Sequence, residues 1–449
     1  MAGAPVSSAP ALEVGFEDRI GFAPTLFFAA QHLLALTGVW VFPSIIGTIL
    51  GLSLIQTSHI VQACLFTTGV VTLLQSGRML RLPVVQGPTG VFLMTTIAVA
   101  QAYGLDAVYG SMLAAACLFA LLALPIPGLD LIGRLTRSAA NPIVYAMLLV
   151  IVGVQLSSVG LANWFGPDPA APQLVSFLLA SFSALTVIAC LVFGGQGLVK
   201  KGGLVIGVAA GSAAAALMGQ WQLPALGEVT PLGLPALAPF GLKVVPAAVF
   251  VMVFAFLHAS IETVGMYSVL CSWAGRPLTR AVANQGLFVE YLGCAAGALF
   301  GGLGTTSYPE NIAIIRVSRV GSRFVTMTAG ALAIALSMLP QLALLIASIP
   351  APVIGAVSTI LFGIIAVNGI QMAREIEWDD LNIAVAAPAF ILASGALFLP
   401  DPVKARLPAY LLPLLSQPMV IGSMLLIVLN LLVNDIVRPL IEREAQGAA

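Results

Sequence analysis

The sequence predicts an all-α polytopic membrane protein with fourteen transmembrane segments, arranged as a 7+7 inverted repeat with short extended breaks in segments 3 and 10. Composition, the placement of basic residues and two matching interruptions predict this class. Of the 449 residues, 59% are hydrophobic and only 8% are charged. A water-soluble chain of this length needs more polar surface, so we expect this chain to lie in a bilayer.

The predicted spans follow one another with short polar connections. Because each half holds an odd number of spans, the second half enters the membrane from the opposite side and is inverted relative to the first. The apolar segments cover residues 23–47, 56–77, 84–103, 105–126, 140–161, 174–197, 203–220, 244–273, 282–302, 304–318, 325–347, 352–373, 381–400 and 411–434.

Basic residues support this count. If each loop takes the number of the span that it follows, the even-numbered loops and both chain ends lie on one side of the membrane. Fifteen of the eighteen lysines and arginines lie on that side, and only Lys243, Lys404 and Arg406 lie on the opposite side. The positive-inside rule then places both termini and the even-numbered loops in the cytoplasm. We expect the protein to lie in the plasma (inner) membrane. The polar head around Glu17 lacks the pattern of a removable signal peptide.

Two segments at corresponding positions of the halves contain glycine, proline and polar residues. These are residues 83–92 in the third segment and 304–312 in the tenth. Each is expected to form a short extended piece followed by a half-helix, with its backbone buried in protein or lining a cavity. The N–H groups at each half-helix start could hold a polar ligand, so Thr89, Gly90 and Tyr308 are candidate binding residues. Two merely kinked helices are the alternative.

Glu262 stands in the middle of an unbroken apolar stretch. A carboxylate at membrane depth costs a few kcal/mol and usually marks a pathway or a binding site. His258 and Met266 lie four residues to either side, on the same helical face. His258 could be a proton partner or a hydrogen-bonded core histidine, and Met266 could pack within the protein or against a flat ring.

Other polar residues interrupt the apolar segments. Glu310 opens the tenth half-helix, and Asn311 beside it can both donate and accept. Glu290 is expected to support an interrupted segment from behind. Gln31 and His32 lie in the first span, where they could face a ligand or hydrogen-bond neighbouring helices.

Two carboxylates, a glutamine and free backbone N–H groups suit a planar heterocycle with alternating N–H and C=O groups on its edge. Apolar walls would bury its faces. A carboxyl group in an apolar pocket can take up a proton near neutral pH, which would couple substrate and proton. The five cysteines lack metal-binding spacing and no nucleophile–base set is present, so we expect no cofactor, no metal and no enzyme activity. The net charge of zero gives no reason to expect nucleic-acid binding.

Several motifs together resemble the nucleobase–ascorbate transporter family, also called the nucleobase:cation symporter-2 or xanthine/uracil permease family, over roughly residues 20 to 435. They are the Gln31-His32 pair, the run from Ile261 to Tyr267, the run from Glu290 to Gly301, and the signature-like run from Thr305 to Arg319.

This resemblance implies a nucleobase symporter coupled to protons, or alternatively to sodium, and a homodimer in contact through its gate domains. It implies that Glu262 and Glu310 hold the base and that His32 and Asn311 support the site. It also implies a core domain of spans 1–4 and 8–11 and a gate domain of spans 5–7 and 12–14. The corresponding boundaries are 1–22 for the N-terminal segment, 23–126 and 243–347 for the core, 127–242 and 348–435 for the gate, and 436–449 for the tail.

The substrate stays open because the specificity signals disagree. Glu310 is similar to uracil-type members, whereas Met266 is similar to xanthine- or urate-type members. Ala313 and Ser318 depart from the family signature, and Gly90 stands where many members carry a phenylalanine that packs on the base. The room at Gly90 favours a bicyclic base. An anion transporter of the sulfate/bicarbonate type shares the 7+7 plan, but two buried glutamates argue against an anion site.

Overall fold

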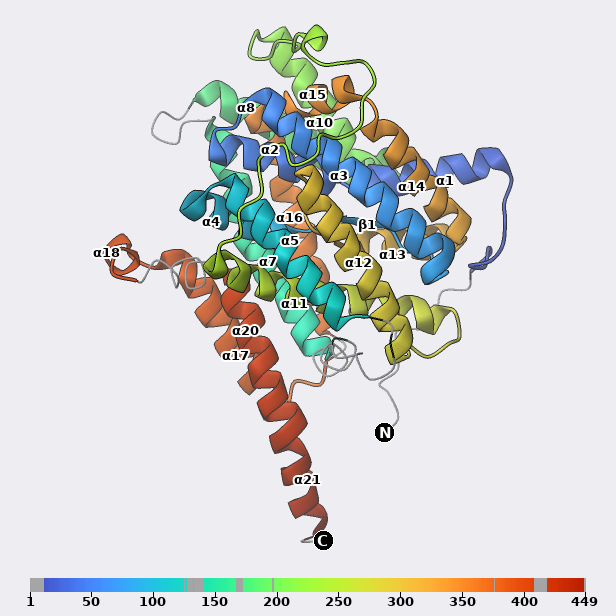
Figure 1. Ribbon diagram of the computed structural model, residues 1–449, viewed down its shortest axis with the longest axis vertical. Helices are drawn as coiled ribbons and strands as arrows, with labels where there is room; N and C mark the ends of the chain where they lie inside the picture. The colour runs from blue at the N-terminus through green and yellow to red at the C-terminus, as the bar shows by residue number, and fades with distance from the viewer. Residues whose placement is uncertain are drawn as a thin grey trace.

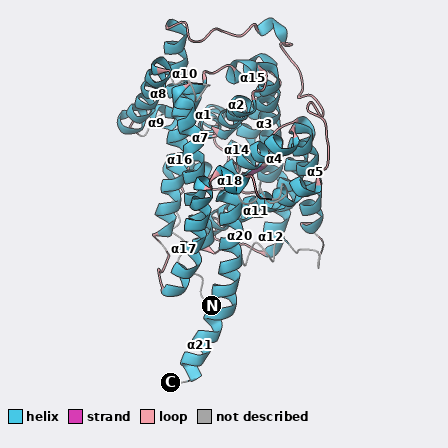
Figure 2. Cartoon of the chain, turned by 90° about the vertical axis from the view of Figure 1, so that its left-hand side faces the viewer, coloured by secondary structure: helices cyan, strands magenta, loops and turns pink. Residues whose placement is uncertain are grey.

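The computed structural model describes residues 12–124, 126, 132, 141–166, 173–195, 198–374, 376–407 and 418–447. Arg134 and Arg137 of the expected cytoplasmic loops, and the start of the expected span 411–434, lie outside these ranges. The described chain is almost entirely helical, and α21 (Arg438–Gly447) extends beyond the helical bundle at one end (Figures 1 and 2).

The first part of the chain contains α1 (Phe22–Ala35), α2 (Gly38–Leu50), α3 (Leu54–Leu74), α4 (Gly90–Tyr103), α5 (Leu105–Leu122), α7 (Pro142–Ala162), α8 (Leu174–Phe193), α9 (Leu198–Lys201) and α10 (Gly203–Leu217). The second part contains α11 (Pro246–Trp273), α12 (Arg280–Phe300), α13 (Pro309–Ser318), α14 (Arg323–Ser337), α15 (Pro340–Ala347), α16 (Ala351–Ala373), α17 (Asp380–Gly395), α18 (Asp401–Lys404) and α20 (Pro418–Asn430).

Nine helical segments in the described ranges are long and apolar enough to cross a membrane, or ten if α14 and α15 form one broken span. The expected span over 325–347 is divided into α14 and α15, which meet at 87°. Pro340 begins α15, and a proline cannot supply the N–H that would continue the preceding helix. The first expected span is also divided, into α1 and α2.

Both expected interruptions are confirmed. Strand β1 (Gln86–Pro88) precedes the half-helix α4, and strand β2 (Thr305–Ser307) precedes the half-helix α13. The two strands also pair with each other, antiparallel, with Gln86 opposite Ser307. They lie among the helices in the interior, drawn in magenta in Figure 2.

Side chains of the surrounding helices satisfy the outer edges of this two-stranded sheet. Thr72 Oγ1 accepts from Gln86 N at 3.0 Å, Thr263 Oγ1 accepts from Ser307 N at 3.1 Å, and Cys294 Sγ accepts from Thr305 N at 3.3 Å. Non-helical backbone at membrane depth is tolerated only with such partners. The pairing and its side-chain partners therefore allow two helices to start inside the bundle.

Glycines are required where Tyr308 crosses the sheet. A Cβ atom on Gly38 would lie 1.9 Å from the Tyr308 hydroxyl, and one on Gly87 would lie 2.6 Å from its ring. The hydroxyl donates to the Pro88 carbonyl at 2.7 Å. Any larger residue at these positions would push Tyr308 out of place.

Residues 12–20, called here the N-terminal strap, run across the connection between α13 and α14. Val14 forms a parallel bridge with Val320. The amide of Gly321 donates to Val14 O at 2.9 Å, and the amide of Arg323 donates to Phe16 O at 3.0 Å. The strap is thus held by backbone as well as side-chain bonds.

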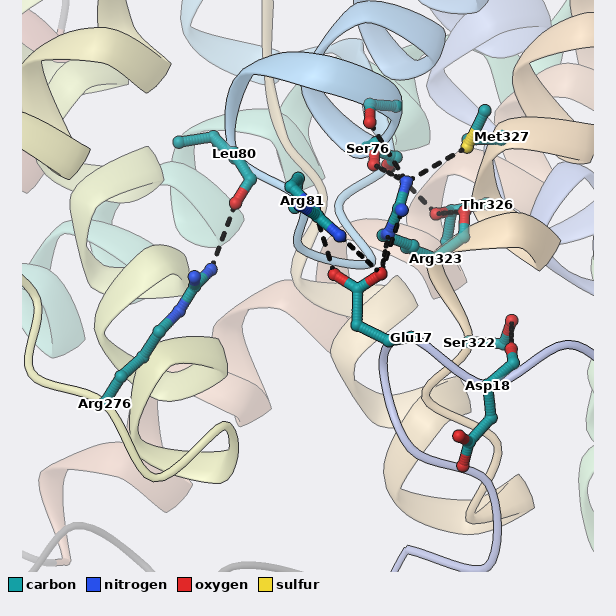
Figure 3. Close-up of polar contacts among 11 residues, drawn as sticks. Glu17, Asp18, Ser76, Leu80, Arg81, Arg276, Ser322, Arg323, Thr326 and Met327 are labelled. Carbon is teal, nitrogen blue, oxygen red and sulfur yellow. Dashed lines mark hydrogen bonds and ion pairs between the residues drawn. The ribbon is translucent and has the colours of Figure 1, made fainter.

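Glu17 ties the strap to both halves of the chain (Figure 3). Its carboxylate accepts from Arg81, which precedes β1, at 3.0 and 3.1 Å, and from Arg323, which follows α13, at 2.9 Å. Arg323 also donates to the carbonyls of Ser76 and Gly77 at 3.3 and 3.0 Å. The Arg323 side chain is only 10% exposed, against 58% for Arg81, so salt screens the Arg323 pair less.

Replacing Glu17 by glutamine should loosen the strap, because the neutral amide removes both ion pairs and offers one acceptor instead of two. Hydrogen exchange of the amides in residues 319–323 should become severalfold faster. Glu13→Gln is the matched control, since Glu13 makes one exposed ion pair, with Arg319 at 3.3 Å. Equal exchange in the two variants would contradict the role given to Glu17.

The N-terminal strap should be less firmly held at acid pH than at neutral pH. The hydrogen bond from Arg81 lowers the pKa of the Glu17 carboxyl, and the bond from Arg323 lowers it further. A group with a lowered pKa stabilises the folded state above its unfolded pKa of about 4.3 and loses this effect as the pH falls. Amide protection, corrected for intrinsic exchange, should stay constant between neutral pH and about pH 6 and fall only in acid.

Candidate functional site

A cavity lies where the two half-helices start. It encloses about 580 Å³ of empty space, including its open mouth. Polar and apolar side chains line it from α2, α4, α7, α11, α13 and α16. The lining residues are Thr37, Phe42, Pro88, Thr89, Gly90, Val91, Leu149, Val152, His258, Glu262, Thr306, Tyr308, Glu310, Leu361, Ile365 and Asn368.

Two carboxyl groups face this cavity from different elements. Glu262 on α11 lies with Oε2 3.4 Å from the hydroxyl of Thr89, the residue that caps α4. Glu310 lies in the first turn of α13, and its Oε2 has no hydrogen-bond partner among the described residues. The site therefore offers carboxylate oxygens with free acceptor capacity.

His32 and Asn311 meet behind the start of α13. Nδ1 of His32 on α1 lies 2.7 Å from Oδ1 of Asn311. The Asn311 amide nitrogen is buried and has no partner in the described part of the chain. Gln31 is buried on the same helix but is not among the residues that line the cavity. The contact fixes the side chain next to Glu310.

A buried polar network lies on the far side of the sheet, with Gln86 at its centre. The Gln86 amide nitrogen is 2.9 Å from Gln75 Oε1, 2.9 Å from Glu290 Oε2 and 3.0 Å from Ser307 Oγ. Thr263, next to Glu262 in the chain, donates to the same Glu290 oxygen at 2.6 Å. Glu290 does not line the cavity, and it connects α12 to β1 through Gln86 and to α11 through Thr263.

His258 and Met266 have different surroundings although they share a helical face. His258 lines the cavity, and its Nδ1 lies 2.7 Å from the hydroxyl of Ser423 on α20. Met266 is not a lining residue and packs against Tyr145 of α7, whose hydroxyl is 3.8 Å from the Met266 sulfur.

Gly90 lines the cavity, but a side chain at this position would point toward α7. A Cβ atom there would lie 2.6 Å from Leu156 Cδ1 and 3.6 Å from Val152 Cγ1. A phenylalanine at this position would therefore first press on α7 and could reach the cavity only after that helix had shifted.

Sequence reasoning missed several residues of the site. Thr37, Thr306 and Asn368 line the cavity, and Gln75 and Thr263 belong to the network behind it. Gln75 and Asn368 are polar residues inside apolar segments, which is the signal that could have identified them. Thr306 lies within the interruption expected over residues 304–312, whereas no signal in the sequence singles out Thr37.

Two solved structures have a fold similar to that of this chain. The transmembrane domain of the cyanobacterial bicarbonate transporter BicA matches 93% of this chain and 100% of that domain, with a TM-score of 0.58 and 15% identity. The structure of SLC26A9 matches 91% of this chain and 66% of its own, with a TM-score of 0.58 and 14% identity. At such identities the similarity concerns the fold alone.

Sequence comparison gives a closer relationship. A model of the Permease family, built for xanthine and uracil permeases, matches residues 23–401. The xanthine permease of Bacillus subtilis (strain 168) is 29% identical over 424 residues, which are 93% of this chain and 95% of that protein. The uric acid transporter UacT of Escherichia coli (strain K12) is 28% identical over 421 residues, or 91% of this chain and 86% of that protein. The chain therefore belongs to the xanthine/uracil permease family, a family of membrane transporters and not of enzymes.

Proposed function

We propose that this protein is a proton-coupled symporter that carries a xanthine- or urate-type purine across the plasma membrane. One observation carries the proposal: Glu262 and Glu310 line the same cavity, at the point where two half-helices begin. Carboxylates at membrane depth are costly and mark transport sites.

The cavity suits a flat base with several ring N–H groups. The carboxylates accept from N–H, while the N–H groups at the half-helix starts can donate to ring carbonyls. Phe42, Val152 and Leu361 supply apolar walls for the ring faces. Each glutamate can also exist as a carboxylic acid, so substrate and proton can bind at one place.

The names of the relatives favour a purine. Proteins about 28% identical to this chain are called xanthine permease or uric acid transporter, and the match covers nearly their whole length. The space expected at Gly90 does not support a bicyclic base, because a side chain at that position would press on Leu156 of α7.

We also propose the architecture of an alternating-access transporter. The nine long apolar helices and the bent pair α14–α15, together with α4, α10, α12 and α13, would make the fourteen expected segments. Helix packing supports a core in which α3 contacts α12 and α14, and a gate in which α7 contacts α16 and α17 contacts α20. Movement of the core relative to the gate would expose the cavity to each side in turn.

An anion transporter is the second candidate, because one solved structure with this fold is a bicarbonate transporter. An anion site needs positive charge or free donors. None of the residues that line the cavity in the described chain is a lysine or an arginine, and two are glutamates. The lining therefore favours the nucleobase.

Uptake measurements test the proposal directly. Cells without their own nucleobase permeases should accumulate labelled xanthine or urate when they express this protein, and a protonophore should abolish the accumulation. Uptake of bicarbonate or sulfate without uptake of any base would favour the anion transporter instead.

Glu262→Gln should be inserted in the membrane normally but lose accumulation of the base. A hydrogen bond to a charged group contributes about 1.5–3 kcal/mol, so uptake at low substrate concentration should fall by about ten- to a hundredfold. The variant also loses its protonatable group, so the remaining uptake should depend less on pH. Near-normal uptake with an unchanged pH profile would refute this role of Glu262.

Glu310→Gln should change the preference among bases more than the amount of protein in the membrane. The amide keeps one acceptor and adds donors, so bases with a different edge pattern should gain relative to xanthine. Competition by a panel of purines and uracil against labelled xanthine measures this preference. An unchanged ranking would show that Glu310 does not touch the ligand.

A further inference from the structure

The hydrogen bonds around His258 fix which of its ring nitrogens carries a hydrogen. Ser423 Oγ lies 2.6 Å from the carbonyl of Met419, one turn earlier on α20, and 2.7 Å from His258 Nδ1. A carbonyl can only accept, so the serine hydrogen points to Met419. The serine has no second hydrogen, and its oxygen must therefore accept from Nδ1 of His258.

This leaves the other ring nitrogen as an acceptor. A neutral imidazole with its hydrogen on Nδ1 carries a lone pair on Nε2. Nε2 of His258 has no partner among the described residues, although the residue is only 2% exposed and lines the cavity. His258 lies one helical turn before Glu262 and on the same face, so both can reach one ligand.

We propose that His258 is a specificity-determining residue, whose Nε2 accepts a ring N–H of the bound base and selects purine diones over single-ring bases. This inference rests on the proposed function. The cavity then presents acceptors from Glu262, Glu310 and His258. Xanthine carries three ring N–H groups to match them, whereas uracil carries two.

A purely structural role is the competing explanation, because the bond to Ser423 also joins α11 to α20. A structural tie would affect the transport of every base equally. If His258 contacts the ligand, its replacement changes the affinity only for bases altered at the ring nitrogen that it touches. This difference distinguishes the two explanations.

The test uses competition against labelled xanthine by xanthines methylated at one ring nitrogen in turn. His258→Phe keeps the ring volume but has no acceptor. Wild-type protein should bind one methylated compound about tenfold more weakly than xanthine because of the lost bond to His258. In the His258→Phe variant, methylation at that ring nitrogen should no longer weaken binding. Methylation at the other ring nitrogens should weaken binding as much as in the wild type.

Ser423→Ala supplies a second readout, because without the serine the ring can move its hydrogen to Nε2 and become a donor. We expect a changed preference for the same methylated position. Ser358→Ala is the control, since Ser358 on α16 is also buried and bonds to its own helix, at Ile354, but does not bond to His258.

The inference is overturned if every methylated xanthine loses as much affinity for His258→Phe as for the wild type. It is also overturned if His258→Phe and Ser423→Ala weaken the binding of every base by the same factor. Normal xanthine uptake by the wild type in that experiment leaves the proposed function intact. A wild-type protein that takes up no purine at all refutes the proposed function itself, and with it this inference.

Discussion

Antiparallel pairing of β1 with β2 is the constraint on which the site depends. A helix can begin in the middle of a membrane protein only if the extended residues before it have partners for their backbone groups. Each strand supplies partners to the other, and Thr72, Thr263 and Cys294 satisfy their outer edges. The starts of α4 and α13 are thereby held at one cavity, with Glu262 beside them.

The same sheet links the site to the rest of the protein. On one side Gln86 joins the strands to Glu290 and Gln75, and on the other Tyr308 donates across the sheet to Pro88. In the N-terminal strap, Glu17 bonds to Arg81, which precedes β1, and to Arg323, which follows α13. A paired sheet between two half-helices suits a binding site whose residues must stay in place.

Much of this site could be predicted because membranes make polar residues conspicuous. Glu262, Glu310 and the two Gly/Pro breaks stand out in apolar segments. The pairing of the breaks could not be predicted, since Gln86 and Ser307 are 221 residues apart and nothing local encodes their register. The contact between His258 and Ser423 depends on tertiary packing in the same way. The 87° bend between α14 and α15 has a local cause at Pro340, but hydropathy alone predicts one continuous span there.

Binding of xanthine to the purified Gln86→Met variant tests the central claim most directly, because Gln86 holds the sheet and does not line the cavity. Gln62→Met is the matched control, as Gln62 is also buried and donates at 2.9 Å to the carbonyls of Gly233 and Ser337, away from the sheet. Calorimetry should show affinity reduced by at least about tenfold in Gln86→Met, from the loss of several buried hydrogen bonds, with the protein still folded. Xanthine affinity equal to that of the wild type in Gln86→Met would contradict the account.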